Sequence, residues 1–160
     1  MQSGIYAVIN TLVPRSSPYW EDAEHPCPPA LAAVSHRCYI GQAKDFERRW
    51  SKDHVHYLLN GRHCCTYLLD AFQEWLRADS GRLELLNLSR TMFKSKWLDR
   101  TTRGQIPAWT LGPFEFRVLE EVPEPLLDTR ETTYLAANRD GYVGSDPAKR
   151  SRRWQKWDGK

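Results

Sequence analysis

The feature that most constrains the fold of this chain is a pair of short apolar runs that each join a tyrosine to a glycine. The two runs are Gly4-Ile5-Tyr6 and Tyr39-Ile40-Gly41. Residues 5–9 are typical of a strand, and residues 38–40 predict a second strand that stops at the glycine. We therefore expect two phenol side chains, those of Tyr6 and Tyr39, in one small sheet.

Polar side chains of three further chemical types follow these runs along the chain. They are the guanidinium of Arg49, the imidazoles of His54, His56 and His63, and the carboxylate of Glu131. With the phenols, these groups supply positive charge, proton transfer and a ligand for a hard cation. Cutting a phosphodiester bond needs that combination.

The chain between and after the predicted strands contains two stretches that interrupt a compact domain. Residues 12–37 hold five prolines, too many for a continuous sheet, and the stretch is too long for a hairpin turn. We expect an inserted loop here, with one helical turn near residues 30–34. A second insertion is predicted at residues 83–112, before a strand at residues 114–119.

The second insertion is a candidate DNA-contacting element, because lysine and arginine neutralise phosphates while interleaved aromatic rings anchor or stack. Its candidate cations are Lys94, Lys96, Arg100 and Arg103. We expect Trp97 and Trp109 in the same stretch to pack on the domain.

The end of the chain is a second candidate for nucleic-acid contact. The net charge is +3, but the last twelve residues carry six cations and one carboxylate, so any attraction for a polyanion is local. The candidate residues here are Arg150, Arg152 and Arg153. Two tryptophans in the same stretch add stacking surface for bases.

Three helices are predicted, at residues 45–60, 64–77 and 126–137. In a projection of the first, at about 100° per residue, Arg49 and His56 point the same way, whereas His54 lies on the other flank of the apolar stripe. In the last helix, Glu131 interrupts an apolar stripe. Burying a carboxylate there is costly unless a cation, hydrogen bonds or a metal ion compensates it.

Four blocks of the sequence resemble, in order, those of the GIY-YIG nuclease superfamily, in particular the catalytic modules of phage intron-type homing endonucleases. The blocks are residues 3–11, residues 39–50, residues 60–63, and residues 116–123 followed by Arg130-Glu131. A lone Gly-Ile-Tyr is a weak match, whereas four ordered blocks with Arg49 and Glu131 at motif positions are more specific.

The resemblance implies an α/β (α+β) domain over residues 1–148: a small, mainly antiparallel three-stranded sheet flanked by helices, here with two insertions. Residues 149–160 would be a basic tail. It also implies a metal-dependent DNA endonuclease that uses one Mg²⁺ or Mn²⁺ ion held by Glu131.

The resemblance also assigns roles to the other candidates. Arg49 would stabilise the phosphorane, Tyr6 or Tyr39 would position or deprotonate the attacking water, and His63 would complete the pocket. His54 would be the active-site histidine if one additional residue is allowed before it. Because the helical projection favours His56 instead, both histidines remain candidates.

One departure from the family pattern concerns activity. Family members commonly carry an asparagine after a late Gly-Tyr pair, but here Val143 follows. Asn138 or Asn10 would have to substitute for that amide. The alternative function is accordingly a catalytically weakened nucleic-acid-binding module of the same fold.

Length and composition agree with one self-sufficient domain. The four cysteines do not form a disulfide framework and no leader opens the sequence, so we expect a reducing, cytoplasmic setting. The resemblance implies that the cell is bacterial or phage-infected. No apolar run is long enough to cross a bilayer, so no membrane partner is expected. DNA is the expected partner, and a monomer and a homodimer both remain open.

A zinc site is a further alternative for the first insertion. It would use two His-x-Cys pairs, His25 with Cys27 and His36 with Cys38. Their spacing matches no common zinc finger.

Overall fold

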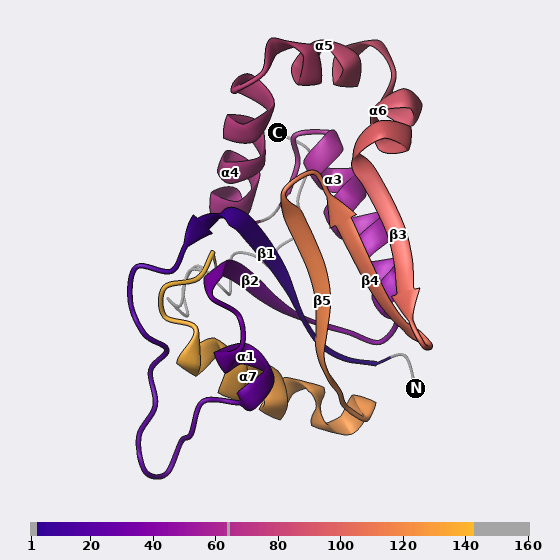
Figure 1. Cartoon of the computed structure of the whole chain (residues 1–160). Coiled ribbons are helices and arrows are strands. Elements are labelled where there is room, and N and C mark those ends of the chain that lie inside the picture. The colour runs from indigo at the N-terminus through magenta and orange to yellow at the C-terminus, as the bar shows by residue number, and fades with distance from the viewer. Residues whose placement is uncertain (1–2, 64, 143–160) are drawn as a thin grey trace.

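The computed structural model describes residues 3–63 and 65–142, which form one five-stranded sheet with helices on both faces (Figure 1). The strands are β1 (Gly4–Pro14), β2 (His36–Ala43), β3 (Leu98–Arg103), β4 (Ile106–Leu111) and β5 (Phe114–Glu121). Their order is β2-β1-β5-β4-β3, and every neighbouring pair is antiparallel. The strand that carries Tyr6 is thus interior, and the strand that carries Tyr39 lies at one edge of this sheet.

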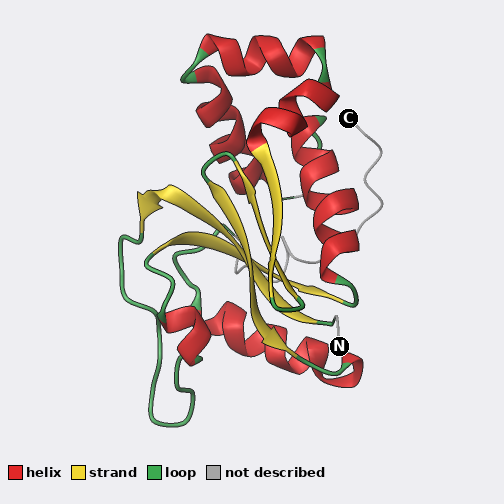
Figure 2. Ribbon diagram, turned by 45° about the vertical axis from the view of Figure 1, so that its right-hand side comes forward, coloured by secondary structure: helices red, strands yellow, loops and turns green. Residues whose placement is uncertain are grey.

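The helices fall into three groups (Figure 2). One continuous segment comprises α2 (Phe46–Arg48), the π-helix η1 (Arg49–Val55) and α3 (His56–Leu59). An arch at one end of the sheet comprises α4 (Thr66–Arg77), α5 (Ser80–Leu88) and α6 (Arg90–Trp97). The third group comprises α1 (Pro29–Ala32), the 3-10 turn η2 (Glu124–Leu126) and α7 (Leu127–Ala137).

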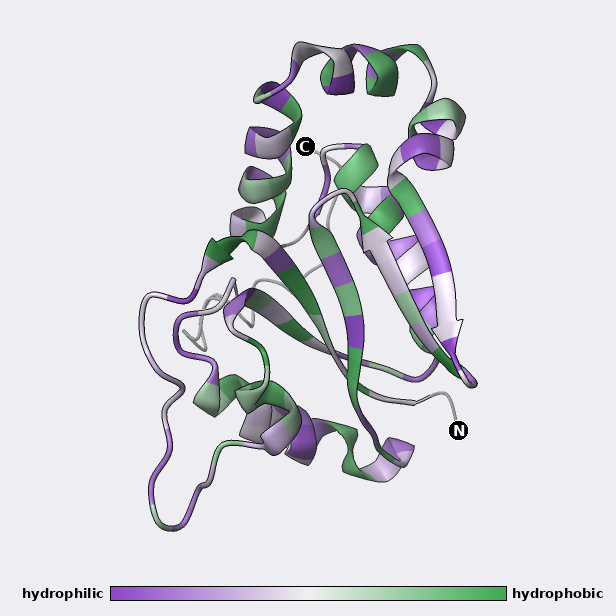
Figure 3. Ribbon diagram, viewed as in Figure 1, coloured by the Kyte–Doolittle hydropathy of each residue, from purple (hydrophilic) through white to green (hydrophobic). Residues whose placement is uncertain are grey.

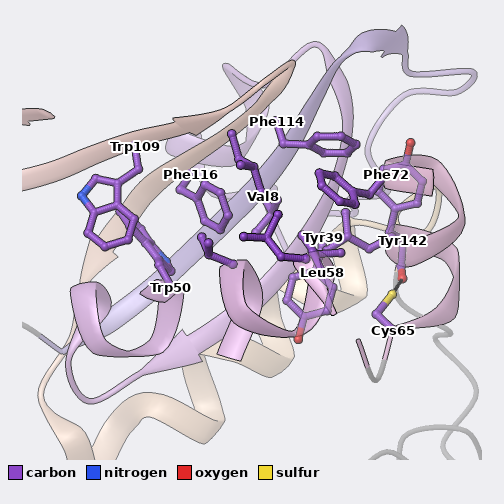
Figure 4. Close-up of a cluster of buried hydrophobic side chains, with 14 of the residues drawn as sticks. Val8, Tyr39, Trp50, Leu58, Cys65, Phe72, Trp109, Phe114, Phe116 and Tyr142 are labelled. Atoms are coloured by element: carbon purple, nitrogen blue, oxygen red, sulfur yellow. Dashed lines mark hydrogen bonds between the residues drawn. The ribbon is translucent and has the colours of Figure 1, made fainter. Parts of the chain in front are cut away.

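Both faces of β1 are buried, and each faces a separate hydrophobic core. Tyr6 and Val8 belong to a core that also contains Trp50, Phe72 and Phe116 (Figure 4). The alternate residues Ile5, Ala7 and Ile9 belong to a core formed with α1 and α7. Successive strand residues point to opposite faces, so a strand covered on both sides has an unbroken apolar run.

The prediction of a three-stranded sheet was wrong, since the sheet has five strands. The two additional strands, β3 and β4, lie within the second insertion. Most of β3 is exposed, so it lacks the alternation that marks a half-buried strand. Its hairpin partner β4 supplies the inward residues Trp109 and Leu111 beside β5, and the colours of Figure 3 show β3 as largely hydrophilic.

The predictions for the remaining elements are confirmed with small changes in their ends. The first insertion contains a helical turn, α1, but β1 continues further into it than expected, with Pro14 paired to His36. The loop is anchored on the α7 side, where the backbone N–H of Trp20 donates to the carbonyl of Ala137 at 3.1 Å. No helix in the described part of the chain is long and apolar enough to cross a membrane.

Candidate functional site

The candidate site begins at Tyr6, whose ring lies across the edge strand of the sheet. Tyr6 of β1 pairs with Gly41 of β2, and the ring occupies the space that a side chain at position 41 would need. The phenol oxygen is therefore directed over β2, toward the helical segment that follows it. Gly41 is required here for close approach rather than for a turn.

A chain of hydrogen bonds links the Tyr6 hydroxyl to two histidines on the same face of the sheet. Tyr6 Oη is hydrogen-bonded to His54 Nε2 by a very short contact. His54 Nδ1 lies 2.6 Å from His63 Nε2, and the backbone N–H of Cys65 donates to His63 Nδ1 at 2.9 Å. Both imidazoles are buried. Because water does not compete for hydrogen bonds between buried groups, the position of each imidazole proton determines which atom donates and which accepts.

The backbone of Cys65 determines both tautomers. Since His63 Nδ1 accepts from that N–H, the proton of a neutral His63 lies on Nε2 and is donated to His54. His54 Nδ1 is then an acceptor, so the proton of His54 lies on Nε2 and points at Tyr6 Oη. The phenol oxygen consequently accepts from His54 rather than donating to it.

Arg49 supplies a second donor to the same oxygen. Its Nε donates to Tyr6 Oη at 3.4 Å, while Nη1 forms an ion pair with Asp53 at 2.6 Å. Burial alone would lower the pKa of Arg49. The neighbouring oxygens of Tyr6, Tyr39 and Asp53 reverse this, and the pKa of Arg49 lies above its usual value. Two N–H donors, one from a permanent cation and one from an imidazole, thus converge on the oxygen of a fully buried phenol.

Tyr39 supports the imidazoles through its ring. Its ring centroid lies 5.1 Å from that of His54 and 5.9 Å from that of His63, in edge-to-face arrangements. The side chain is buried in the core that also contains Trp50 and Phe116 (Figure 4). The Tyr39 oxygen is also close enough to Arg49 to raise the pKa of that guanidinium.

The π-helix η1 explains why His54, and not His56, reaches this cluster. Hydrogen bonds in a π-helix run from residue i to i+5, so each turn takes up one residue more than an α-helical turn. The prediction that Arg49 and His56 point the same way was wrong, because it assumed α-helical spacing. His56 is exposed and contacts Asn60. His54 lies within η1, five residues after Arg49.

Glu131 lies on the opposite face of β2. It is buried in the α7 helix, and its carboxylate accepts a hydrogen bond from Gln42 Nε2 at 3.3 Å. Gln42 pairs with Ile5, which points away from the Tyr6 face, whereas Gly41 pairs with Tyr6. The structure thus gathers Tyr6, Tyr39, Arg49, His54 and His63 on one face of the edge strand. It places Glu131 on the other.

Glu131 shares its hydrogen-bond donor with a second carboxylate. Gln42 Nε2 also donates to Asp128 at 2.7 Å, so an amide N–H donor lies between the oxygens of Asp128 and Glu131. Carboxylate and amide oxygens, completed by water, are the ligands that Mg²⁺ prefers. Within residues 3–63 and 65–142 no group of three or more His, Cys, Asp or Glu side chains is arranged to hold a metal ion, so water or substrate oxygens would complete the coordination.

The predicted zinc ligands are not brought together. Cys38 is buried and contacts Asn138, while His25 is exposed and pairs with Asp22. His36 contacts Ser35 on the surface.

The basic residues of the second insertion lie on two elements. Lys94 and Lys96 are in α6, whereas Arg100 and Arg103 are in β3. Their aromatic neighbours pack inward as predicted: Trp109 is buried against Trp50, and Trp97 lies on Trp75. The other predicted contacts, Arg150, Arg152 and Arg153, lie outside the described residues.

The two asparagines proposed as substitutes have other partners. Asn10 donates to the Tyr142 hydroxyl at 2.9 Å, and Asn138 donates to the carbonyl of Cys38 at 3.1 Å. Val143 itself lies outside the described residues. These contacts place both amides outside the Tyr6 group.

Sequence reasoning missed three contributors to the site: the backbone N–H of Cys65, Gln42 and Asp128. A backbone donor leaves no signal in the sequence. Gln42 could have been found, since it follows Gly41 and must point to the opposite face of the strand. Asp128 precedes Glu131 by three residues, a spacing that puts both on one side of a helix.

Comparisons of the chain with protein-family models, with curated proteins and with solved structures each find no match.

Proposed function

We propose that this protein is a metal-dependent DNA endonuclease that hydrolyses phosphodiester bonds, with Tyr6 as its general base. The observation that carries the proposal is the double donation to Tyr6 Oη, from Arg49 Nε and from the Nε2–H of His54. A free phenol is a poor base near neutral pH, because its pKa is about 10. Hydrogen bonds donated to a charged oxygen stabilise it, so these two donors would offset the cost of forming an anion at this buried position.

The groups around Tyr6 then have distinct tasks. The Tyr6 phenolate takes a proton from the attacking water. Arg49 stabilises the charge that develops on the phosphorane, since its pKa is held above the usual value and it stays protonated. His54 positions the phenolate, and His63 acts through His54 by holding its tautomer.

The cofactor of the proposal is one Mg²⁺ or Mn²⁺ ion held by Glu131, with Asp128 beside it. Such an ion supplies Lewis-acid polarisation of the phosphoryl group and stabilises the leaving oxygen. The same residues carry the resemblance to the GIY-YIG nucleases, which supports the same reaction.

One observation favours the alternative, a nucleic-acid-binding module that has lost its chemistry. Glu131 lies across β2 from Tyr6 and is occupied by Gln42, so the two halves of the site are separate. Binding of DNA that persists without divalent metal, together with no cutting, would support this reading.

The test is nicking of supercoiled plasmid by the purified protein with Mg²⁺ or Mn²⁺, beside EDTA. We expect Tyr6→Phe to lower the nicking rate about 10²- to 10⁴-fold, the usual contribution of a general base. Tyr67→Phe is the matched control, because it removes a phenol from an exposed position of α4. Metal-dependent nicking that Tyr6→Phe leaves intact would overturn the assignment of Tyr6.

A further inference from the structure

A groove of about 430 Å³ lies between the η1 helix and the β3–β4 hairpin, on the part of the second insertion that the proposed chemistry does not use. In Figure 1 the helical segment runs behind β3 and β4. Trp109 lines the groove together with three cations: Arg48, Lys52 and Arg100. The walls also carry the hydroxyls of Ser51 and Thr102.

We propose that this groove binds the sugar-phosphate backbone of a DNA strand next to the phosphate that is cut. The proposal rests on the endonuclease function proposed above. Cations with neighbouring hydroxyl groups are the usual partners of phosphate oxygens. The groove and the chemical site also share one turn of helix, since Arg48 lines the groove while Arg49 contacts Tyr6.

Arg100 is held in a fixed position on the groove wall. It pairs with Trp109 across β3 and β4, and its guanidinium carbon lies 4.9 Å from the centroid of the indole ring. Trp109 is buried against Trp50, which belongs to η1. The hairpin thus packs on the helix through two tryptophans, and the stacked arginine is pre-organised for an anion.

Two carboxylates, Asp45 and Glu47, also line the groove. Asp45 caps the helix, because its side chain accepts from the backbone N–H of Arg48 at 3.1 Å. Its charge is therefore directed at the positive end of the helix. Glu47 weakens the attraction for a polyanion, which makes it a sensitive probe: removing its charge should strengthen DNA binding.

The experiment is binding of a labelled 30-base-pair duplex of arbitrary sequence, followed by fluorescence anisotropy over a series of salt concentrations. Neutralising one phosphate contact lowers the slope of log K against log salt by about one. We expect Arg100→Gln to weaken binding about eightfold at 0.1 M salt, and Arg48→Gln, Lys52→Gln and Arg100→Gln combined to weaken it roughly 500-fold. Glu47→Gln should strengthen it several-fold.

Arg139→Gln is the matched control, because Arg139 also stacks on a tryptophan, Trp20, at 4.2 Å but lies directly after α7. The inference would be overturned if Arg100→Gln and Arg139→Gln had the same slope of log K against log salt and Glu47→Gln bound DNA as the wild type does. Competition by millimolar inorganic phosphate alone would indicate a small phosphate ligand and would likewise overturn it. Thermal unfolding of each variant checks that the fold is intact.

Plasmid nicking separates this inference from the proposed function. The wild type could nick plasmid while the groove variants keep the wild-type slope of log K against log salt. That result would support the endonuclease function and reject the groove as a DNA-binding site. DNA binding that the groove variants weaken, without any nicking by the wild type, would instead reject the endonuclease function. The groove would then belong to a nucleic-acid-binding module.

Discussion

The ring of Tyr6 lies so close to Gly41 that a methyl group at position 41 would sit 2.5 Å from the phenol oxygen and 2.6 Å from the ring carbon that bears it. Real side-chain carbons do not approach that closely. The absence of a side chain on the edge strand is therefore what lets the phenol extend over β2 to Arg49 and His54. This relationship links a glycine that has no chemistry of its own to the proposed general base.

Gly41→Ala is expected to abolish nicking while the fold survives. The added methyl forces Tyr6 out of its position, at a cost of about 1–3 kcal/mol typical of overpacking. Plasmid nicking measures the first effect, and chemical denaturation measures the second. A variant that unfolds at a lower denaturant concentration but nicks at the wild-type rate would show that the position of Tyr6 over Gly41 is unimportant for cutting.

His63→Ala should lower the nicking rate roughly 10²-fold by releasing the tautomer of His54. Without the donor at His63 Nε2, His54 is no longer required to carry its proton on Nε2. Nitrogen-15 NMR of the imidazoles distinguishes the two tautomers. We expect the wild type to show His54 with the proton on Nε2 and the variant to show a mixture. An unchanged His54 spectrum would contradict the hydrogen-bond chain.

Arg49→Lys should lower nicking about 10-fold or more although the charge is retained, because a lysine lacks the fork that bonds Tyr6 and Asp53 together. Asp53→Asn is the companion variant. It keeps the guanidinium and removes only its carboxylate partner, so a much smaller loss is expected. Equal losses in the two variants would show that the ion pair, and not the contact with Tyr6, is what matters.

Glu131→Gln should remove metal-dependent nicking, and Asp128→Asn should raise the Mg²⁺ concentration needed for half of the maximal rate. The reason is that Glu131 holds the ion in the proposed function, and Asp128 is the carboxylate that shares the Gln42 Nε2 donor with it. Titration of nicking with Mg²⁺ measures both effects. Unchanged metal dependence in both variants would place the ion elsewhere.

The ion pair between Glu120 and Arg130 should make stability depend on pH. The hydrogen bonds from Arg130, followed by that from Tyr134, lower the pKa of Glu120 below its ordinary 4.5. A lowered folded pKa contributes stability that is present above the unfolded value and is lost as the pH falls through the folded value. Both side chains are 35% exposed, so solvent screening keeps the contribution below about 1 kcal/mol.

Glu120→Gln should accordingly be less stable than the wild type at pH 7 and closely similar at pH 2.5. Thermal unfolding at the two values tests this. A difference that grows toward acid would have the wrong sign for a carboxylate held in its charged form.

The sequence by itself was enough to predict the helices and strands whose residues follow a local apolar pattern. The strands with Tyr6 and Tyr39, the amphipathic helix α4 and the helix with Glu131 all follow from apolar periodicity, which reflects burial directly. The chemical types of the site residues were also readable.

Tertiary structure alone decided which of those residues meet. The π-helical turn between Arg49 and Val55 brings His54 to Tyr6, because it changes the angular spacing that a projection assumes. The pairing of Gln42 with Ile5 puts Glu131 across the edge strand, since strand register sets the face of every side chain. The exposed strand β3 joins the sheet by pairing with β4, and its own composition does not predict a strand. The last two depend on pairing between residues distant in the chain, and the first depends on a helix type that apolar periodicity does not distinguish.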